Sequence, residues 1–368
     1  MDQIESVAKA CQLLNAFRND RETVRLKDLV ARTGLNAATA LRILRTFEQH
    51  GLVARVGRSG YRVLVKPSKT LRYRFGYASQ GEDSAFSQEW SESIIQAARA
   101  ENVELLVFNN GPSSGDALKN ADLMVREKID LAIEHQFNEQ IAPLLSARFL
   151  KAKVPLIAMG AAHAGATYFG GNNYQAGYIG GRGLGAWAKK EWNGQAHQLV
   201  LVEMTMAGPL LQSRMIGVET GVKEVLPELR QVVRLEGEGN FGDTLKLLRR
   251  HLSRTRARKI LLGAVNDPAA LGALRAFEEA GWESECAVVG QGGAVEARKE
   301  MRRPQTRLIG TVGFFPEKYG DAIMRIAFDL LENRPVPPAV FTRHRLLTAK
   351  NVDHYYPNDI LLKNAAPG

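Results

Sequence analysis

Cationic and short polar side chains share one face of a helix predicted to follow Asn36. At helical spacing this face carries Ala38, Thr39, Arg42 and Arg45, and Asn36 precedes it as an N-cap. An arginine guanidinium can bridge the O6 and N7 atoms of guanine, and small neighbouring side chains allow close approach to base edges. The pattern is typical of a helix that enters the major groove of DNA.

The elements that must position this face form a helix-turn-helix. The opposite face of the same helix is an apolar stripe at i, i+3, i+4 and i+7, made of Ala40, Ile43, Leu44 and Phe47. A shorter amphipathic helix with Leu29 precedes it, and Gly34 between the two helices can adopt the positive φ of a tight turn. A helical hairpin whose polar face is merely solvated is the alternative interpretation.

The next segment makes that alternative weaker. Two short apolar runs over residues 52–65 flank a glycine-rich turn, which predicts a β-hairpin directly after the helix. The hairpin carries Arg55, Arg58 and Arg62. Basic residues on such a wing can bind phosphates or enter the minor groove.

Residues 4–64 resemble the winged helix-turn-helix of the IclR family of bacterial regulators. The matching segments are 7–14, 26–29, 33–35, Thr39 with Arg42, 51–53 and 61–62. The first helix is expected over residues 4–18, and its apolar residues lie largely on one side: Ile4, Val7, Ala8, Cys11, Leu14 and Ala16.

Charge is concentrated at the N-terminus of this chain of 368 residues. Residues 1–74 hold 15 Lys and Arg against 6 Asp and Glu, whereas the remaining residues hold 34 against 33. A basic module joined to a near-neutral body is typical of a nucleic-acid binder with a second task. Two cysteines far apart in the sequence form no disulfide framework, and no long apolar run or signal segment is visible, so we expect a cytoplasmic protein without a membrane span.

From Leu71 onward the pattern alternates between strand-like runs and amphipathic helices. Strands are predicted at 71–78, 103–109, 130–134 and 155–159, with helices at 88–101, 116–127 and 139–151 between them. A second series of the same kind follows Gly170, so we expect two parallel-sheet α/β lobes with a ligand cleft between them. The GxGxxG-like spacing at 180–185 lies within a predicted helix, and we interpret it as close helix packing rather than as a phosphate site.

Residues 71 to about 361 resemble the type I periplasmic-binding-protein domain of ribose-binding proteins, which is also the effector fold of LacI/GalR regulators. The resemblance rests on segments 155–159, 168–177, 266–273, 310–320 and 348–356 and on Arg214 with Gly217. It implies an α/β fold class: a winged helix-turn-helix (1–66), a linker (67–70) and a two-lobed type I periplasmic-binding-protein fold (71–368). We expect lobe 1 to hold about 71–172 and 308–333, and lobe 2 about 173–307 and 334–368.

The resemblance also implies which positions contact a ligand. These are Ser84, Phe86, Glu134, Met159, Gly160, Arg214, Phe241, Asn266, Gln291 and Phe314. Phe86 and Phe241 would form aromatic walls for a sugar ring, and Arg214 and Asn266 would form polar contacts. Met159-Gly160 stands where these sugar binders usually have Asp-Arg, and Gln291 where they usually have Asp. These departures leave two alternatives to a simple pentose or hexose bound in the usual way: a less hydroxylated, modified or partly apolar ligand, or a sugar that different residues recognise.

Together the two resemblances imply a regulator that binds double-stranded operator DNA and senses a sugar-like effector. We expect a homodimer, because two-fold operators match two-fold proteins. The alternative is a solute-binding protein of a sugar ABC transporter with an atypical N-terminus. An enzyme is the less supported reading, since we find no catalytic constellation, no metal-ligand spacing and no cofactor motif.

Overall fold

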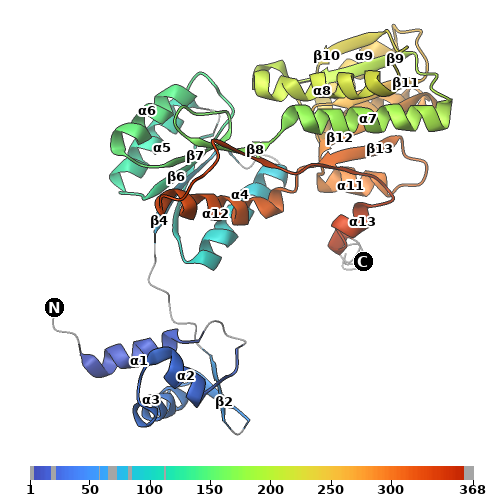
Figure 1. The fold of residues 1–368 in the computed structure, drawn as a ribbon. Coiled ribbons are helices and arrows are strands. Elements are labelled where there is room, and N and C mark those ends of the chain that lie inside the picture. Colours follow the sequence, from blue (N-terminus) through green and yellow to red (C-terminus); the bar gives the residue numbers. More distant parts are fainter. Residues whose placement is uncertain are drawn as a thin grey trace. The chain divides into compact units, whose positions relative to one another are not determined.

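The computed structural model describes residues 4–17, 22–57, 59–64, 73–81, 85–111 and 113–359. The chain divides into two compact units, Met1–Tyr73 and Arg74–Gly368 (Figure 1). Arg58, predicted to contact DNA, and Ser84, predicted to contact a ligand, lie outside the described residues.

The smaller unit is a three-helix module with a small sheet. Its elements are α1 (Glu5–Asn15), β1 (Val24–Arg25), α2 (Leu26–Thr33), α3 (Ala37–Gln49), β2 (Val53–Val56) and β3 (Gly60–Val63). The antiparallel strands lie in the order β1-β3-β2. Gly34 ends α2 with φ +69°, and the Asn36 side chain accepts a hydrogen bond from the Thr39 amide at 2.7 Å, so the predicted turn and N-cap are confirmed. Leu13, Leu29, Leu44 and Phe47 belong to its core.

The apolar side predicted for the first helix packs on the core only through Leu14 and Ala16. Ile4 and Val7 are 69% and 54% exposed, and Cys11 is exposed, whereas Leu13 and Phe17 are buried. The correction has a simple cause: α1 ends at Asn15, and only the side chains near its C-terminal end reach the core that α2 and α3 share.

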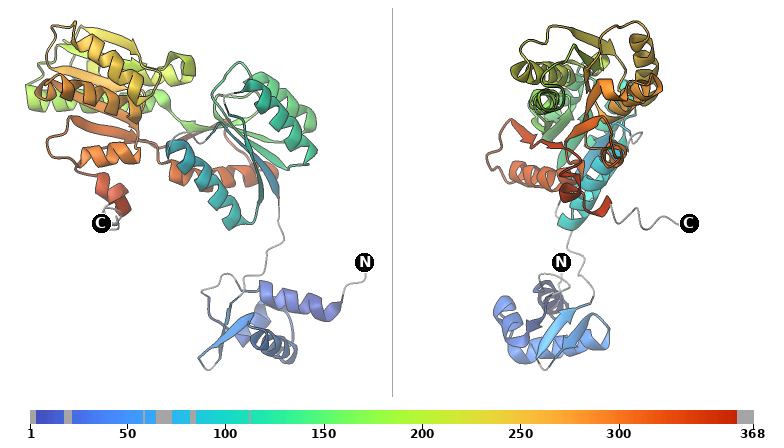
Figure 2. Two further views of the ribbon diagram at one scale, coloured as in Figure 1. Left: turned by 180° about the vertical axis from the view of Figure 1, so that it is seen from behind. Right: turned by 90° about the vertical axis from the view of Figure 1, so that its right-hand side faces the viewer.

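The first lobe of the larger unit is a six-stranded parallel sheet. Its strands, in spatial order, are β14 (Ala339–Thr342), β8 (Thr167–Gly171), β7 (Leu156–Gly160), β6 (Leu131–Gln136), β4 (Arg74–Ser79) and β5 (Glu104–Asn109). Its helices are α4 (Ala85–Glu101), α5 (Ser114–Arg126), α6 (Ala142–Ala152) and α12 (Tyr319–Leu331). Helix α4 packs on α12 and α5 packs on α6, one pair on each face of the sheet (Figures 1 and 2).

The second lobe repeats this layering. Its strands, in spatial order, are β10 (Val232–Glu236), β9 (Gln198–Glu203), β11 (Ile260–Ala264), β12 (Cys286–Gly292), β13 (Leu308–Gly313) and the antiparallel β15 (Arg345–Leu347). Its helices are α7 (Asn173–Trp192), α8 (Pro209–Val225), α9 (Phe241–Leu252), α10 (Asp267–Glu279), α11 (Val295–Met301) and α13 (Val352–Tyr355). Cys286 is buried at the start of β12, and burial raises the pKa of its thiol to about 12.

Glycines bring α7 and α8 into backbone contact. A Cβ atom on Gly181 would lie 2.1 Å from the Val218 carbonyl oxygen, and one on Gly177 would lie 1.8 Å from the Arg214 carbonyl oxygen. These approaches exclude any side chain at either position. The glycine-rich run at 180–185 therefore lies in a packed helix, as the sequence predicted.

The chain crosses between the lobes three times, and two boundaries differ from our expectation. Strand β13 pairs with β12 in the second lobe, although we had placed 308–333 in the first. Strand β14 pairs with β8 in the first lobe, although we had placed 334–368 in the second. A short apolar strand carries no local signal for which sheet it joins, so the pattern alone could not assign these two strands.

Candidate functional site

A cavity of about 470 Å³ lies between the two lobes of the larger unit. The predicted ligand positions that line it are Phe86, Gly160, Arg214, Asn266, Gln291 and Phe314. They come from distant parts of the chain, and α4, β7, α8, α10, β12 and the segment after β13 position them. Their role in binding a ligand stays a prediction.

Arg214 is held in place by neutral groups. Its Nε and Nη2 atoms donate to Asn173 Oδ1 at 3.1 and 2.6 Å, and Nη1 donates to the Val265 carbonyl. Its guanidinium carbon lies 4.7 Å from the centre of the Phe314 ring. Burial lowers the pKa of Arg214 to about 10, so the side chain stays charged at neutral pH. The result is a rigid cation in the cavity wall.

An aromatic wall faces the cavity from the first lobe. Phe86 and Trp90 lie one turn apart on α4, with ring centroids 5.8 Å apart and an interplanar angle of 84°. Phe86 meets Phe314 in a similar edge-to-face contact at 6.3 Å. Trp90 also stacks on His135, with ring centroids 4.2 Å apart. Such rings pack well against the C–H groups of a small organic ligand.

Two amide side chains line the same cavity with different hydrogen-bonding capacity. Asn266 caps α10: its Oδ1 accepts from the Ala269 amide at 3.0 Å, and its Nδ2 donates to the Gly239 carbonyl at 2.7 Å. Gln291 is 1% exposed, and within the described part of the chain neither its amide oxygen nor its amide nitrogen has a partner. Gln291 is therefore the amide with unused capacity toward a ligand.

Asp267 is a cavity residue that the sequence analysis missed. Its Oδ1 accepts from the Thr311 hydroxyl at 2.5 Å, and its Oδ2 accepts from the Gly293 and Ala294 amides at 2.7 and 2.6 Å. Burial raises the pKa of this carboxyl, and these hydrogen bonds oppose the rise. Because both oxygens are occupied, Asp267 fixes the loop after β12.

Other lining residues were also missed, and some of them had a visible signal. They include Trp90, Phe137, Glu139, Tyr168, Asn173, Met204, Glu296 and Tyr319. Trp90 follows Phe86 by four residues, which is one helical turn, and Asn173 stands inside a segment that carried the family resemblance. Tyr168 and Tyr319 also stand inside such segments, 168–177 and 310–320.

Three predicted positions do not line the cavity. Glu134 on β6 is fully buried, accepts a hydrogen bond from Asn110 at 2.6 Å, and has its pKa raised by burial to about 8. Met159 on β7 is fully buried in the lobe core. Phe241 begins α9 with a side chain that is 44% exposed. Its backbone packs against Gly272.

The segments that join the lobes pack on one another beside the cavity. A Cβ atom on Gly171 would lie 2.5 Å from Phe314 Cε1 and 2.9 Å from His344 Cε1. The Phe314 and His344 rings are 4.5 Å apart. Phe314 thus touches Arg214 and both neighbouring crossings, so it connects the inter-lobe cavity to the segments that join the lobes.

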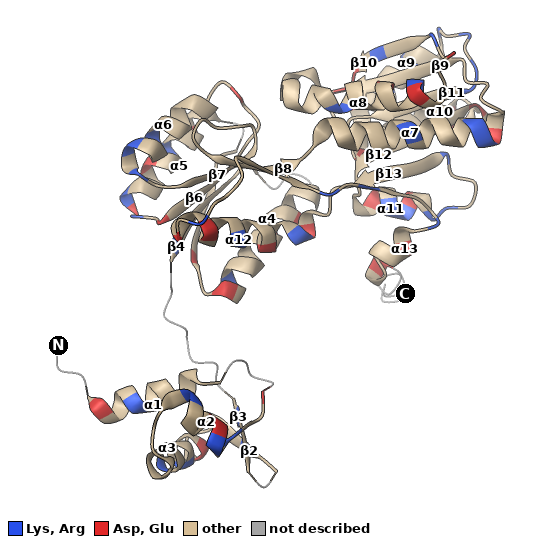
Figure 3. Cartoon of the chain, viewed as in Figure 1, with Lys and Arg blue, Asp and Glu red and all other residues tan. Residues whose placement is uncertain are grey.

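The smaller unit carries the predicted DNA-binding residues on two elements. On α3, Ala38, Arg42 and Arg45 are exposed and Thr39 is half-buried. On the hairpin, Arg55 pairs with the buried Tyr61 and Arg62 pairs with Ala54. Because directly opposed residues share a face, Arg55 and Arg62 lie on opposite faces of the hairpin. Figure 3 shows the basic residues along these elements.

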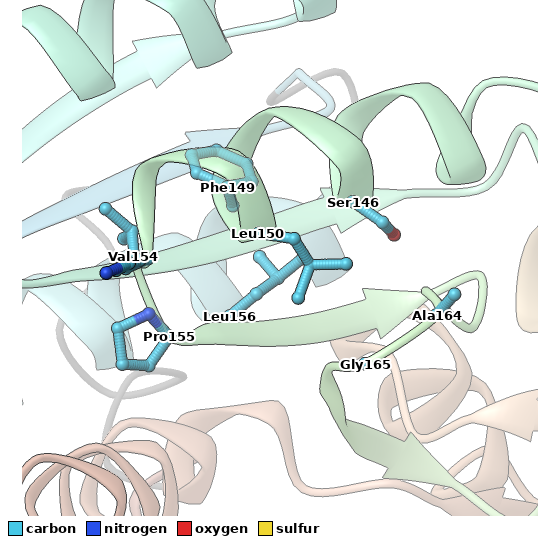
Figure 4. Close-up of a pocket in the computed structure, with 9 residues that line it drawn as sticks. Ser146, Phe149, Leu150, Val154, Pro155, Leu156, Ala164 and Gly165 are labelled. Carbon is cyan, nitrogen blue, oxygen red and sulfur yellow. The ribbon is translucent and has the colours of Figure 1, made fainter.

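A second cavity of about 250 Å³ lies within the first lobe. It is formed by α6 and the segments at 153–156 and 164–165, with Phe149, Leu150 and Leu156 among its lining residues (Figure 4). Its lining is mainly apolar and includes no predicted site residue.

Within the described ranges, no cluster of three or more His, Cys, Asp or Glu side chains is arranged to hold a metal ion. None of the helices described is both long and apolar enough to cross a membrane.

The fold and the site define a class of protein: a winged helix-turn-helix joined to a two-lobed module with an inter-lobe cavity. The chain belongs to the periplasmic binding protein domain family, whose model matches residues 75–335. The model of the IclR helix-turn-helix domain matches residues 6–57. The predicted fold class and the fusion of these two domains are therefore confirmed. Both are binding domains rather than catalytic families.

Solved structures share the fold of the larger unit. A periplasmic solute-binding protein from Actinobacillus succinogenes with bound D-allose aligns with a TM-score of 0.68 and 17% identity, over 77% of this chain and 100% of that one. A solute-binding protein from Bacillus halodurans with bound myo-inositol aligns with a TM-score of 0.66 and 19% identity, over 78% and 98%. A solute-binding protein from Agrobacterium vitis with bound allitol aligns with a TM-score of 0.67 and 16% identity, over 78% of this chain and 100% of that one. Comparison with curated proteins gave no match.

Proposed function

We propose that this chain is a bacterial transcriptional regulator that binds operator DNA and senses a sugar-like molecule. The observation that carries the proposal is the presence, in one chain, of a helix-turn-helix with exposed arginines on α3 and of a two-lobed module with an inter-lobe cavity. The basic N-terminal unit would gain affinity for DNA by displacing counterions from phosphates.

The residues proposed for each task lie in separate units. For DNA they are Asn36, Ala38, Thr39, Arg42, Arg45, Arg55 and Arg62, with Arg58 outside the described residues. For the ligand they are Phe86, Gly160, Arg214, Asn266, Gln291 and Phe314. We propose a homodimer in the cytoplasm, because a two-fold protein matches a two-fold operator.

The proposed coupling runs through the hinge. A ligand in the cavity would contact Phe314, which packs on Gly171 and on His344 in the neighbouring crossings. Closure of the two lobes on the ligand would therefore repack all three crossings together. Such hinge closure shifts the balance between two arrangements of a protein and can bias a second site.

The alternative is a solute-binding protein that serves a sugar transporter. The solved structures that share the fold favour it, since several are solute-binding proteins of ABC transporters. The N-terminal helix-turn-helix favours the regulator, because a solute-binding protein has no use for a DNA-reading helix.

The test is a DNA-binding assay on the full chain. Fluorescence anisotropy with duplexes tiling the upstream region of its own gene would identify an operator, and a thermal-shift panel of aldoses, polyols, amino sugars and sugar acids would identify a ligand. The regulator proposal expects the ligand to change operator affinity. A chain that binds a sugar but binds operator candidates no better than unrelated DNA would overturn it and favour the transport alternative.

A further inference from the structure

The inner part of the inter-lobe cavity offers more hydrogen-bond donors than acceptors. The Trp90 indole N–H is buried without a partner among the described residues, and so is the amide of Gln291. Three of the five N–H groups of Arg214 are used by Asn173 and Val265, which leaves one on each terminal nitrogen. A ligand that fits here must supply acceptor oxygens.

The charge on Arg214 also lacks an ion-pair partner. No carboxylate of the described residues lies within 4.0 Å of its guanidinium, whose contacts are an amide oxygen, a backbone carbonyl and an aromatic ring. The Asp267 carboxylate lines the same cavity and attracts the Arg214 charge from beyond ion-pair distance, while its two oxygens accept three hydrogen bonds from Thr311, Gly293 and Ala294. A cation held in a low-dielectric wall without a carboxylate in direct contact favours a ligand that brings an anionic group to it.

Two further carboxylates, Glu139 and Glu296, line the cavity from opposite lobes, and both are exposed. Exposed carboxylates remain hydrated, so they repel an inner anion only weakly. They can accept hydrogen bonds from hydroxyl groups. The cavity thus combines an inner cation, an aromatic wall and outer hydroxyl acceptors.

We propose that the ligand is a carboxylated sugar derivative, an aldonate or a uronate. Its carboxylate accepts hydrogen bonds from Arg214, and its carbon skeleton lies against Phe86, Trp90 and Phe314. This inference rests on the proposed sensor function and specifies the chemical class that the sensor recognises.

Matched ligand pairs test the inference on the full chain. Thermal shift and calorimetry would compare gluconate with glucitol, galactonate with galactitol, glucuronate with glucose and galacturonate with galactose. We expect an acid to bind at least about tenfold more tightly than its neutral counterpart, since a charge-assisted hydrogen bond contributes about that factor. Equal or tighter binding of the neutral members would overturn the inference and leave the sensor proposal standing. No binding by either class would overturn both.

Two variants separate the charge from general effects on folding. Arg214→Gln should lower affinity for the acid at least about tenfold. The control is Arg182→Gln on the exposed side of α7, which removes the same charge from the lobe surface and should leave affinity within about twofold. Gln291→Glu leaves Arg214 intact and places a carboxylate in the cavity, so it should reverse the preference toward the neutral partner. A Gln291→Glu variant that still prefers the acid would contradict the inference.

Discussion

At the scale of single residues, arginine occupies two different environments in this chain. Arg42 is exposed on α3, where a guanidinium can meet base edges, whereas Arg214 is held inside a cavity by Asn173 and Val265. The Arg42 side chain is exposed to solvent, whereas hydrogen bonds fix the orientation of the Arg214 side chain. Their substitutions should therefore affect different measurements.

We expect Arg42→Ala to weaken binding to the operator by about 1 to 3 kcal/mol, because a bidentate contact to a base is worth that much. Anisotropy titrations with operator and with unrelated DNA would measure the change. The matched control is Lys9→Ala on α1, where Lys9 pairs with Glu5. Equal losses on both DNAs would show that Arg42 binds only phosphate.

Glu134 gives a second prediction at the residue scale, about pH. Burial raises its pKa in the folded chain from the ordinary 4.5 to about 8. Between these values the unfolded chain has released the proton that the folded chain retains, so stability falls as pH rises. Burial lowers the pKa of His135 to about 4, which works in the opposite direction below pH 6.5. The effect of Glu134 should therefore dominate between about pH 6.5 and 8.

Glu134→Gln isolates this effect because it keeps a similar shape and removes the titration. The gain in unfolding free energy over the parent protein should grow with pH by up to about 1.4 kcal/mol per pH unit. Denaturant unfolding at pH 5, 6, 7 and 8 measures it. A difference that stays constant across these pH values would mean that Glu134 is ionised in the folded protein.

At the scale of elements, the contact between α7 and α8 depends on missing side chains. Gly181→Ala would bring a methyl group into the Val218 carbonyl oxygen, so the two helices must separate. We expect a loss of about 1 to 3 kcal/mol or more in unfolding free energy. Gly115→Ala on α5 is the control, because only the Ser113 hydroxyl lies within 4 Å of the added carbon, at 3.6 Å. Glycine replacement there should stabilise by about 0.5 to 1 kcal/mol. If the two substitutions changed the unfolding free energy equally, close packing of α7 on α8 could not be the cause of the loss at Gly181.

The sequence predicted individual helices and strands better than it predicted which strands pair with one another. Up to β12, periodicity predicted the type and order of the helices and strands except β1 and β8, whereas the elements after β12 were not predicted individually. The N-cap at Asn36 followed from residue chemistry. Strands β13 and β14 were assigned to the wrong lobes because strand pairing is a long-range contact. Family resemblance placed Arg214 and Gln291 at the cavity, yet Phe241 lies outside it because it begins a helix that faces α10. Side-chain direction at a helix end depends on tertiary packing.

At the scale of the whole molecule, two binding sites in one chain must obey reciprocity. If the ligand changes the affinity for operator DNA by some factor, the operator must change the affinity for the ligand by the same factor, typically about 5 to 150-fold for coupled sites. Calorimetry of the ligand with free protein and with the protein–DNA complex measures this. Because reciprocity holds for any coupled site, a ligand affinity that the operator leaves unchanged, beside a clear effect of ligand on DNA binding, would mean that the site titrated by calorimetry is not the site through which the ligand acts on DNA binding.

The two cysteines make the native chain selectively addressable by chemistry. Cys11 is exposed on α1, whereas Cys286 is buried with its thiol pKa raised to about 12. Only thiolates react readily with maleimides, so a dye should attach to the DNA-binding unit alone while the protein is folded. The sequence thus already contains a single position that accepts a fluorescent dye. Motion of the smaller unit could be followed by fluorescence without removing or adding a cysteine.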